Sequence, residues 1–219
     1  IQRDDILSFN LPQHNSSVLE MAPVFIRRCI ALPGDTLKID CKQVLINSDT
    51  IMEAYKINQY RLYCSDLKSI LKESGFSNAE FNTISKTGIF NTFLNQQELM
   101  KLKNHEKVSS IQPVTNHDKR FNPAIFPHEQ MLNWNEDYFG PFIIPYKGMK
   151  ITLNYKNYIQ YHYLISFWEG ETIQEGQEYT FQKDYYFMMA DHRDKFRDSR
   201  HYGPVPRIAF IGFVGVSLY

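Results

Sequence analysis

The sequence predicts a mainly β fold of antiparallel strands, interrupted by an inserted α+β subdomain of the ferredoxin-like βαββαβ type. Three observations support this. Short segments of alternating apolar and polar residues lie towards both ends of the chain, aromatic residues make up 15% of it, and clear helix start and stop signals gather in its middle. We therefore expect a β domain formed by residues 1–53 and 115–219, with residues 54–114 as the insert.

Alternating apolar and polar residues mark the strands expected outside the insert. These strands cover residues 5–11, 24–32, 36–40, 43–47, 142–146, 150–155 and 208–219. Residues 115–145 are expected to form a connecting loop, because prolines recur there and exclude long regular elements. Apolar residues at helical spacing predict a short helix at residues 155–168, and residues 169–189 have the pattern of a hairpin.

The insert combines strand and helix signals in the order of a split βαβ unit. Strands are expected at residues 55–64, 79–85, 89–94 and 108–114, and helices at residues 66–74 and 96–103. Ser65 is placed to cap the first helix, and Gly75 follows it as a C-terminal glycine. Asn95 with Glu98 matches a capping box for the second helix.

Composition narrows the possible functions. Lys and Arg together number 24, as do Asp and Glu, so no net positive charge favours nucleic acid as a partner. No run of 18 apolar residues is present, and the chain opens at Ile1 without a secretory signal, so we interpret it as a fragment or a mature form. Cys29, Cys41 and Cys64 lack CxxC spacing, which argues against a zinc site and favours buried free thiols. We expect no metal and no cofactor.

The most informative segment is YYFMMADHRDKFRDSRHYGPVP, residues 185–206. Its composition alone predicts that the charged middle, residues 191–200, forms a solvated turn. Its order, however, resembles the motif G-D-N-R-D-N-S-x-D-S-R-x-W-G-x-V-P of bacterial signal peptidase I, a family of membrane-anchored serine peptidases that remove signal peptides outside the cytoplasmic membrane. The matching positions are Asp191, Arg193, Asp194, Asp198, Ser199, Arg200, Gly203, Val205 and Pro206.

Other segments resemble the same family in order and spacing. RDDILSFNLP, residues 3–12, is similar to its G-D-I-V-V-F-x-x-P strand, and FIRRCIALPGDTLKI, residues 25–39, to Y-I-K-R-V-I-G-L-P-G-D-T-V-x-I. WNEDYFGPFIIPYKG, residues 134–148, looks like the connector of a branch with a longer insert. The resemblance covers residues 1–53 and 127–219, least of all the insert. It implies an antiparallel β fold with an inserted subdomain. It also implies that the domain lies on the extracytoplasmic (periplasmic) side of the cell membrane and is held there by an anchor upstream of Ile1.

The family cleaves by a Ser/Lys dyad, in which a buried, neutral lysine takes the proton of the attacking serine. The resemblance places that lysine at Arg27, while Arg28 matches the arginine that follows it. A guanidinium stays protonated at any accessible pH and is therefore a poor base. The motif serine that orients the lysine is replaced by Phe196, which has no hydrogen-bond acceptor. A cation-π contact between Arg27 and Phe196 is a plausible replacement.

Two of the other departures from the motif are at Ala190 and His192. Ala190 stands for the glycine and would be strained at positive φ. His192 stands for the first asparagine and is a conceivable alternative base, because imidazole titrates near neutral pH.

The family's nucleophilic serine precedes the lysine by tens of residues, so we expect it upstream of Ile1. Ser16 and Ser17 lie in a loop between two matched strands and are poor candidates. Asp198 and Arg200 are expected to form a structural ion pair rather than to act in catalysis.

Three hypotheses follow for function. The first is a signal-peptidase-like domain that recognises signal peptides of secreted preproteins by β-augmentation, with its proteolysis lost or weakened. The second is an active signal peptidase with an upstream serine and another base, either His192 or a misaligned lysine. The third is a non-catalytic assembly or docking factor that uses the insert. The expected partners are signal peptides and the membrane, and the oligomeric state is left open.

Overall fold

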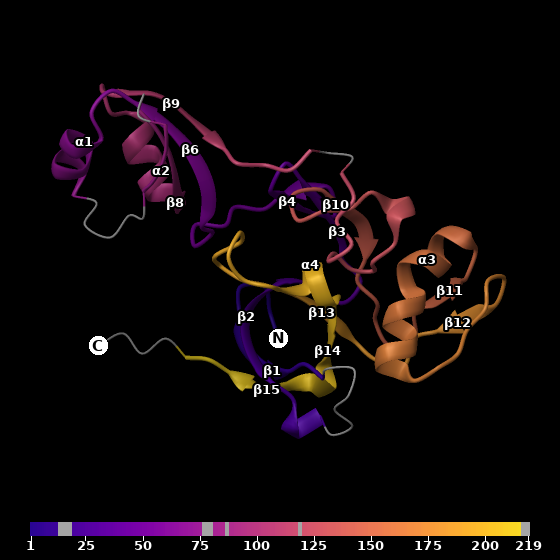
Figure 1. Cartoon of the computed structure of the whole chain (residues 1–219). Coiled ribbons are helices and arrows are strands. Elements are labelled where there is room, and N and C mark those ends of the chain that lie inside the picture. The colour runs from indigo at the N-terminus through magenta and orange to yellow at the C-terminus, as the bar shows by residue number, and fades with distance from the viewer. Residues whose placement is uncertain (13–18, 76–80, 86–87, 118–119, 216–219) are drawn as a thin grey trace. The chain divides into compact units, whose positions relative to one another are not determined.

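The computed structural model describes residues 1–12, 19–75, 81–85, 88–117 and 120–215. It divides into two compact units, drawn in Figure 1. Unit 1 consists of Ile1–Ile51, Asn116–Ala190 and Arg197–Tyr219, and unit 2 of Met52–Thr115 and Asp191–Phe196. Antiparallel sheets dominate, so the predicted mainly β class is confirmed.

A five-stranded antiparallel sheet forms the centre of unit 1, in the order β14-β13-β2-β1-β15. Its strands are β1 (Ile6–Asn10), β2 (Val24–Ala31), β13 (Tyr185–Met189), β14 (Val205–Pro206) and β15 (Phe210–Phe213). The first and last strands, β1 and β15, are therefore neighbours, as the indigo and yellow strands of Figure 1 show. β1 runs along β2 from Val24 to Arg28, whereas β13 pairs with β2 only from Arg28 to Ala31.

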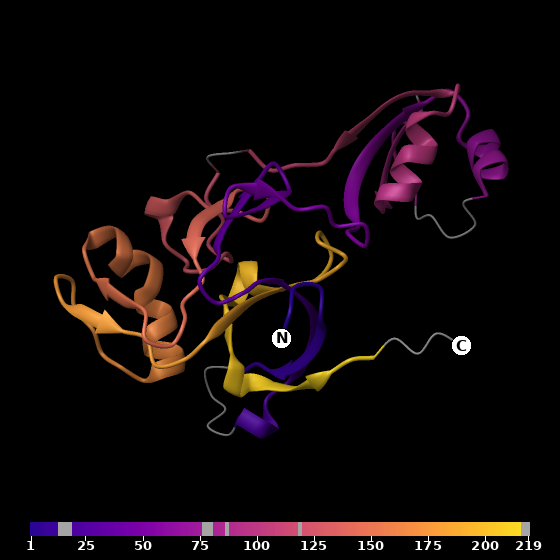
Figure 2. The same ribbon diagram turned by 180° about the vertical axis from the view of Figure 1, so that it is seen from behind.

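Two smaller sheets and two helices complete unit 1. β10 (Phe139–Ile143), β3 (Thr36–Asp40), β4 (Gln43–Ile46) and β5 (Asp49–Thr50) form a sheet in that order, and β11 (Lys150–Thr152) pairs with β12 (Glu178–Thr180). α3 (Tyr155–Leu164) continues into a π-helical turn at Ile165–Glu169 and lies beside the β11–β12 ribbon in both Figure 1 and Figure 2. α4 (Ser199–Tyr202) is a single turn, and 3-10 turns span Leu19–Met21, Gln130–Leu132 and Arg207–Ala209.

An aromatic cluster holds the five-stranded sheet together. Phe9 stacks on Phe25 with ring centroids 6.1 Å apart and meets Phe210 edge-on at 5.8 Å. The buried residues of this core are Leu7, Phe9, Cys29, Met188, Val205 and Ala209. Alternate residues of a strand point to the same face, so the period-2 pattern of β1 and β2 places these side chains inside.

Unit 2 has the βαββαβ order expected of the insert. Its elements are β6 (Asn58–Cys64), α1 (Leu67–Ser74), β7 (Asn82–Ser85), β8 (Ile89–Leu94), α2 (Gln96–Lys103) and β9 (Val108–Pro113). The antiparallel sheet has the order β7-β8-β6-β9, in which β8 separates β6 from β7 as a split βαβ unit requires. Both helices contribute to one core, made of Leu62, Cys64, Ile70, Leu94, Leu99 and Leu102.

Two of the three helix caps predicted for unit 2 agree with the structure. Gly75 ends α1 in the left-handed conformation at φ 71°, and Asn95 and Glu98 form the predicted capping box of α2. The prediction that Ser65 caps α1 is wrong. Asp66 caps it instead, because its carboxylate reaches the Ser69 amide at 3.1 Å while Ser65 lies one residue too early.

The predicted hairpin at residues 169–189 is also wrong. β12 pairs with β11, and β13 pairs with β2 and β14. Alternation identified both strands but carries no information about their partners, which long-range packing selects.

The three cysteines are free thiols. Cys29 and Cys64 are buried as expected, but Cys41 is exposed. Cys41 and Lys42 form the two-residue turn between β3 and β4, and both have positive φ, 50° and 65°. Such hairpin turns lie at the surface, which is why this thiol faces solvent.

Candidate functional site

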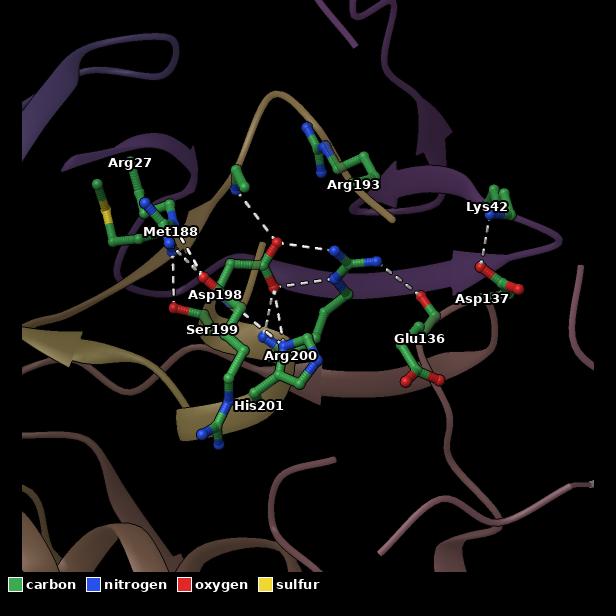
Figure 3. Close-up of polar contacts among 12 residues, drawn as sticks. Arg27, Lys42, Glu136, Asp137, Met188, Arg193, Asp198, Ser199, Arg200 and His201 are labelled. Atoms are coloured by element: carbon green, nitrogen blue, oxygen red, sulfur yellow. Dashed lines mark hydrogen bonds and ion pairs between the residues drawn. The ribbon is translucent and has the colours of Figure 1, made fainter. Parts of the chain in front are cut away.

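Arg27 projects from β2 and is tied to the second half of the motif segment. Its Nε and Nη2 both donate to the Arg197 carbonyl oxygen, at 2.9 and 2.7 Å, and its Nη1 donates to the Ile26 carbonyl at 2.6 Å. The guanidinium carbon also lies 5.5 Å from the centroid of the Phe25 ring. Figure 3 shows Arg27 beside the motif segment. The fork of donors thus links β2 to the loop that precedes α4, a geometry that a lysine amine, without a rigid fork of donors, does not reproduce.

Arg27 makes a cation-π contact within its own strand. Its guanidinium covers the ring of Phe25, two residues earlier on β2. Alternation places both side chains on one face of β2, so they meet without any help from the motif segment. Phe196 itself is half exposed and belongs to unit 2.

Asp198 and Arg200 form a buried ion pair. Arg200 donates from Nε and Nη2 to the two carboxylate oxygens of Asp198, at 2.9 and 2.8 Å, in the two-pronged geometry drawn in Figure 3. Asp198 also accepts the amides of Ala190 and Arg200, and it caps α4. Arg200 reaches further, from Nη1 to the Glu136 carbonyl at 3.2 Å. The contacts with the Ala190 and Arg200 amides and with the Glu136 carbonyl hold backbone around the pair, which is what a structural ion pair does.

Ser199 is also turned inward. Its Oγ accepts the Met188 amide at 2.9 Å, and the residue is fully buried. This contact joins α4 to β13. A buried hydroxyl engaged with backbone is a fixing point for the segment rather than a nucleophile open to substrate.

The protonation of buried groups in unit 1 follows from burial. Burial raises the pKa of Tyr202 well above its ordinary value, and the Asp198 carboxylate adds to the effect. Burial raises the pKa of the Cys29 thiol to about 12. Both groups therefore stay protonated at neutral pH, and neither supplies an anionic nucleophile or a base.

The first half of the motif segment belongs to unit 2. The backbone of His192 bridges to Ile57, with the Ile57 amide 2.9 Å from the Asp191 carbonyl and the Arg193 amide 3.0 Å from the Ile57 carbonyl. The Gln59 amide donates to Asp194 at 2.6 Å. Residues 191–194 thus run along the chain segment that leads into β6.

A buried ion pair reinforces this attachment. Arg193 donates to the carboxylate of Glu53, and both side chains are almost completely buried. The amine of Lys56 lies 3.4 Å from the other oxygen of Glu53. The Glu53 carboxylate therefore lies between the buried Arg193 guanidinium and the Lys56 amine. Arg193 of the motif segment is one partner of this buried ion pair.

His192 lies among aromatic rings in unit 2. Its ring centroid is 4.6 Å from that of Phe93 and 6.0 Å from that of Phe196. These contacts give the imidazole a packing role on the sheet of unit 2.

A serine and a lysine do meet in unit 2, but not as a dyad. Ser69 hydrogen-bonds both Glu73, at 2.5 Å, and Lys107. Lys107 also lies 3.0 Å from Glu73, and the hydrogen bond to that carboxylate raises the pKa of the lysine. A lysine kept charged by a carboxylate cannot accept the serine proton, so the cluster is a surface ion pair.

The structure tests one of two minor expectations and leaves the other as a prediction. Ala190 is not among the positive-φ residues of the described chain, so replacement of the motif glycine causes no backbone strain there. Ser16 and Ser17 lie outside the described residues.

Lys42, a lysine of low exposure in unit 1, pairs with Asp137 at 3.4 Å.

Comparison with protein families decides the classification. A family model described as signal peptidase, peptidase S26, matches residues 1–120 and 144–219. The chain belongs to the signal peptidase family. The match includes the insert, where we expected the least coverage, and leaves out part of the connector. The comparison with curated proteins finds no match.

Several residues of this signal-peptidase-like site were missed by sequence reasoning. The Arg197 carbonyl, which holds Arg27, belongs to a motif position that accepts any residue, so side-chain patterns cannot reveal it. Glu53, the partner of Arg193, is distant in sequence and has no motif of its own. Tyr202 could have been identified from the sequence, since the family motif has an aromatic residue at this position.

Family membership implies a membrane-associated protein. Within the described residues, every helix is too short or too polar to traverse a bilayer. The side of the membrane on which the domain lies is a matter for proposal.

Proposed function

We propose that this chain is the extracytoplasmic domain of a signal-peptidase-like protein that recognises signal peptides and has lost, or nearly lost, the Ser/Lys proteolysis of its family. The observation that carries the proposal is the state of Arg27. By its resemblance to the family motif Arg27 stands at the position of the dyad lysine, and its permanently charged guanidinium donates to the Arg197 carbonyl. A group in this state has no lone pair with which to take a serine proton.

The edge of β2 supports the peptide-binding part of the proposal. β13 pairs with β2 as far as Arg28, and the preceding residues from Val24 have β1 as their partner among the described strands. Val24 and Ile26 are 59% and 51% exposed on one face of this segment. An extended peptide can add to such an edge through backbone hydrogen bonds, with its side chains alternating between the two faces. Peptide binding of this kind needs no lysine.

The test is a cleavage assay on the full-length protein with a signal-peptide substrate. The wild type is compared with an Arg27→Lys, Phe196→Ser double variant, which restores both missing groups. Arg28→Lys with Phe196→Ser is the matched control, because Arg28 is the adjacent arginine and its Nη1 donates to the Asp4 carbonyl. We expect no cleavage by the wild type and none by the control. Cleavage by the restored variant would show that the protein is a peptidase that has lost its general base.

Other outcomes select the alternatives. Equal cleavage by the wild type and the restored variant would overturn the proposal in favour of an active enzyme with another base, which His192→Ala would then test. If neither the wild type nor the restored variant cleaves the substrate, binding of an uncleaved signal peptide to the wild type distinguishes peptide recognition from the docking-factor hypothesis. Absence of binding would favour the docking-factor hypothesis, in which deletion of residues 54–114 abolishes partner capture.

The extracytoplasmic location is tested separately. The experiment uses cells whose outer layers have been removed and whose cytoplasmic membrane is intact. An added protease should digest this domain if an upstream anchor holds it outside that membrane. Protection until the cells are lysed would place it inside.

A further inference from the structure

A cavity of about 330 Å³ opens in unit 1 on the face of β2 that carries Phe25. This volume lies within the range of small-ligand sites. The lining residues are Leu11, Pro12, Phe25, His128, Tyr163, Phe167, Arg197, His201 and Tyr202. All of them belong to unit 1, and they come from separate segments of the chain.

Aromatic rings make up much of the lining. Tyr163 and Phe167 stack in parallel with ring centroids 5.8 Å apart, and His128 meets Tyr163 edge-on at 5.3 Å. The rings of Phe25 and Tyr202 lie 5.9 Å apart. A large apolar or aromatic side chain gains both buried area and ring contacts against such walls, whereas a methyl group gains little of either.

The two histidines of the lining have hydrogen-bond partners within the protein. The Nδ1 atom of His201 accepts the Asp198 amide at 3.2 Å, and that of His128 lies 2.9 Å from the Pro123 carbonyl oxygen. An apolar group that entered the cavity would leave these hydrogen bonds in place, so it would not incur the cost of an unsatisfied polar group there.

Phe25, which lines the cavity, stands between two β2 residues whose backbone groups are directed away from β1. β1 bonds to β2 at odd-numbered positions such as Cys29, whose amide donates to the Asp5 carbonyl at 2.9 Å. Backbone groups of successive residues point to opposite sides of a strand, so those of Val24 and Ile26 point away from β1. The Ile26 carbonyl accepts one bond, from the guanidinium of the next residue at 2.6 Å, and retains a second lone pair.

An extended peptide added to this edge places successive side chains on opposite faces of the sheet. A side chain opposite Phe25 shares its face and meets the cavity, whereas the two flanking side chains share the face of Val24 and Ile26. The end of a signal peptide has a matching alternation, because small residues stand on both sides of an unrestricted middle residue in the A-x-A pattern. Small side chains would leave the cavity unfilled, so the middle residue is the one that suits it.

We infer that this cavity binds the middle side chain of the A-x-A segment, so that the protein selects signal peptides in which that residue is large and apolar or aromatic. The inference rests on the proposed function, which supplies the peptide and its place along β2, and adds a residue preference to it. The requirement for small residues on either side is unaffected, because they lie on the other face of β2. Tyr163 and Phe167 are the specificity-determining residues of this site.

The test measures binding of uncleaved peptides to the full-length protein by calorimetry. The probes are three copies of one signal-peptide segment, acetylated and amidated at their ends, which differ only in having Ala-Phe-Ala, Ala-Leu-Ala or Ala-Ala-Ala at the cleavage site. We expect the Phe and Leu peptides to bind at least about ten-fold more tightly than the Ala peptide, since burial of a large apolar side chain supplies a ratio of this size.

Two variants of the lining test the preference from opposite directions. Phe167→Ala removes an aromatic wall and should reduce the preference for the Phe peptide to less than about three-fold, with the affinity for the Ala peptide unchanged. Leu11→Phe narrows the cavity and should also weaken binding of the Phe peptide selectively. Phe213→Ala is the matched control, because Phe213 is an exposed ring of unit 1 outside the cavity lining. The control should keep the wild-type preference.

Crosslinking locates the middle side chain. Photo-leucine at the middle position should form adducts with residues of the lining such as Tyr163 and Phe167, identified by mass spectrometry. Adducts confined to Val24 and Ile26 would place this side chain on the opposite face and overturn the inference. Equal affinity for the three peptides, or an undiminished preference in both cavity variants, would overturn it as well.

Failure of the inference and failure of the proposed function are distinguishable. The Ala peptide depends on the β2 edge alone. If it binds and the Phe and Leu peptides bind no more tightly, the proposed function stands and the cavity inference falls. If none of the three peptides binds, recognition of signal peptides along β2 is itself overturned, and the inference falls with it.

Discussion

At the scale of residues, charges in this protein are used to hold backbone. Arg27 binds the Arg197 carbonyl, Arg200 binds Glu136 and Asp198, and Asp198 accepts two backbone amides. Asp198 and Arg200 are buried, and buried charges cost free energy to desolvate, so each is stable only while its partner is present. Loss of one partner is therefore expected to be severe.

Asp198→Asn tests this at the most buried position. The substitution leaves the Arg200 guanidinium without an anion in a site where Asp198 is fully buried. We expect a loss of roughly 3–5 kcal/mol in the free energy of unfolding, measured by urea denaturation. The control is Asp40→Asn, which breaks the exposed pair with Lys38 and should cost less than about 1 kcal/mol. Similar losses for the two variants would contradict the role of the buried pair.

At the scale of elements, the motif segment is divided between two supports. Residues 191–194 are attached to the start of β6 by backbone and side-chain contacts in unit 2. Residues 198–200 are attached to β13 in unit 1. A single sequence motif thus supplies anchoring groups to two separate cores.

Glu53→Gln should loosen the first of these attachments. It removes the carboxylate that faces the buried Arg193, and breaking a buried pair typically costs about 3–5 kcal/mol. The readout is hydrogen exchange of the Ile57 and Arg193 amides, which bond to Asp191 and Ile57. Their exchange should accelerate at least ten-fold, while amides of β1 keep their rates. Unchanged exchange at both amides would show that the ion pair does not hold the segment.

The link between α1 and the chain before β9 is sensitive to acid. Hydrogen bonds from Ser69 and Lys107 lower the pKa of Glu73 from 4.5 to about 2. Because the folded pKa is the lower one, the stabilisation is fully present above about pH 4.5 and is lost as the pH falls towards 2. Carboxyl titration by NMR should give a midpoint near 2, and Ser69→Ala should raise it. A midpoint near 4.5 in the wild type would refute the contacts.

At the scale of the whole molecule, two units have separate hydrophobic cores. The two tryptophans of the chain, Trp134 and Trp168, both belong to unit 1. Tryptophan fluorescence therefore reports on unit 1, while far-ultraviolet circular dichroism reports on both. This difference makes the independence of the cores measurable.

Leu62→Ala should destabilise unit 2 alone. Leu62 is fully buried in its core, and removal of such a side chain costs about 2–5 kcal/mol. We expect part of the dichroism transition in urea to move to lower concentration while the fluorescence transition stays in place. Leu7→Ala, in the core of unit 1, is the matched control and should move the fluorescence transition. A joint shift in both variants would mean that the units unfold together.

Sequence by itself determined the local structure and the family. Alternating residues identified β2, the pair Asn95 and Glu98 identified the start of α2, and the order of residues 191–206 identified the signal peptidase motif. These features depend on neighbours a few residues apart, whose spacing the backbone geometry converts directly into structure. The prediction that Arg27 stands at the position of the dyad lysine likewise came from the sequence alone.

Tertiary structure alone decided the partners. The pairing of β12 with β11, the contact of Arg27 with the Arg197 carbonyl, and the burial of Glu53 against Arg193 each join residues far apart in the chain. The cavity beside Phe25 is likewise assembled from separate segments. Such contacts are selected by packing and by the need to satisfy buried polar groups across the whole fold, and a pattern in one stretch of sequence contains neither.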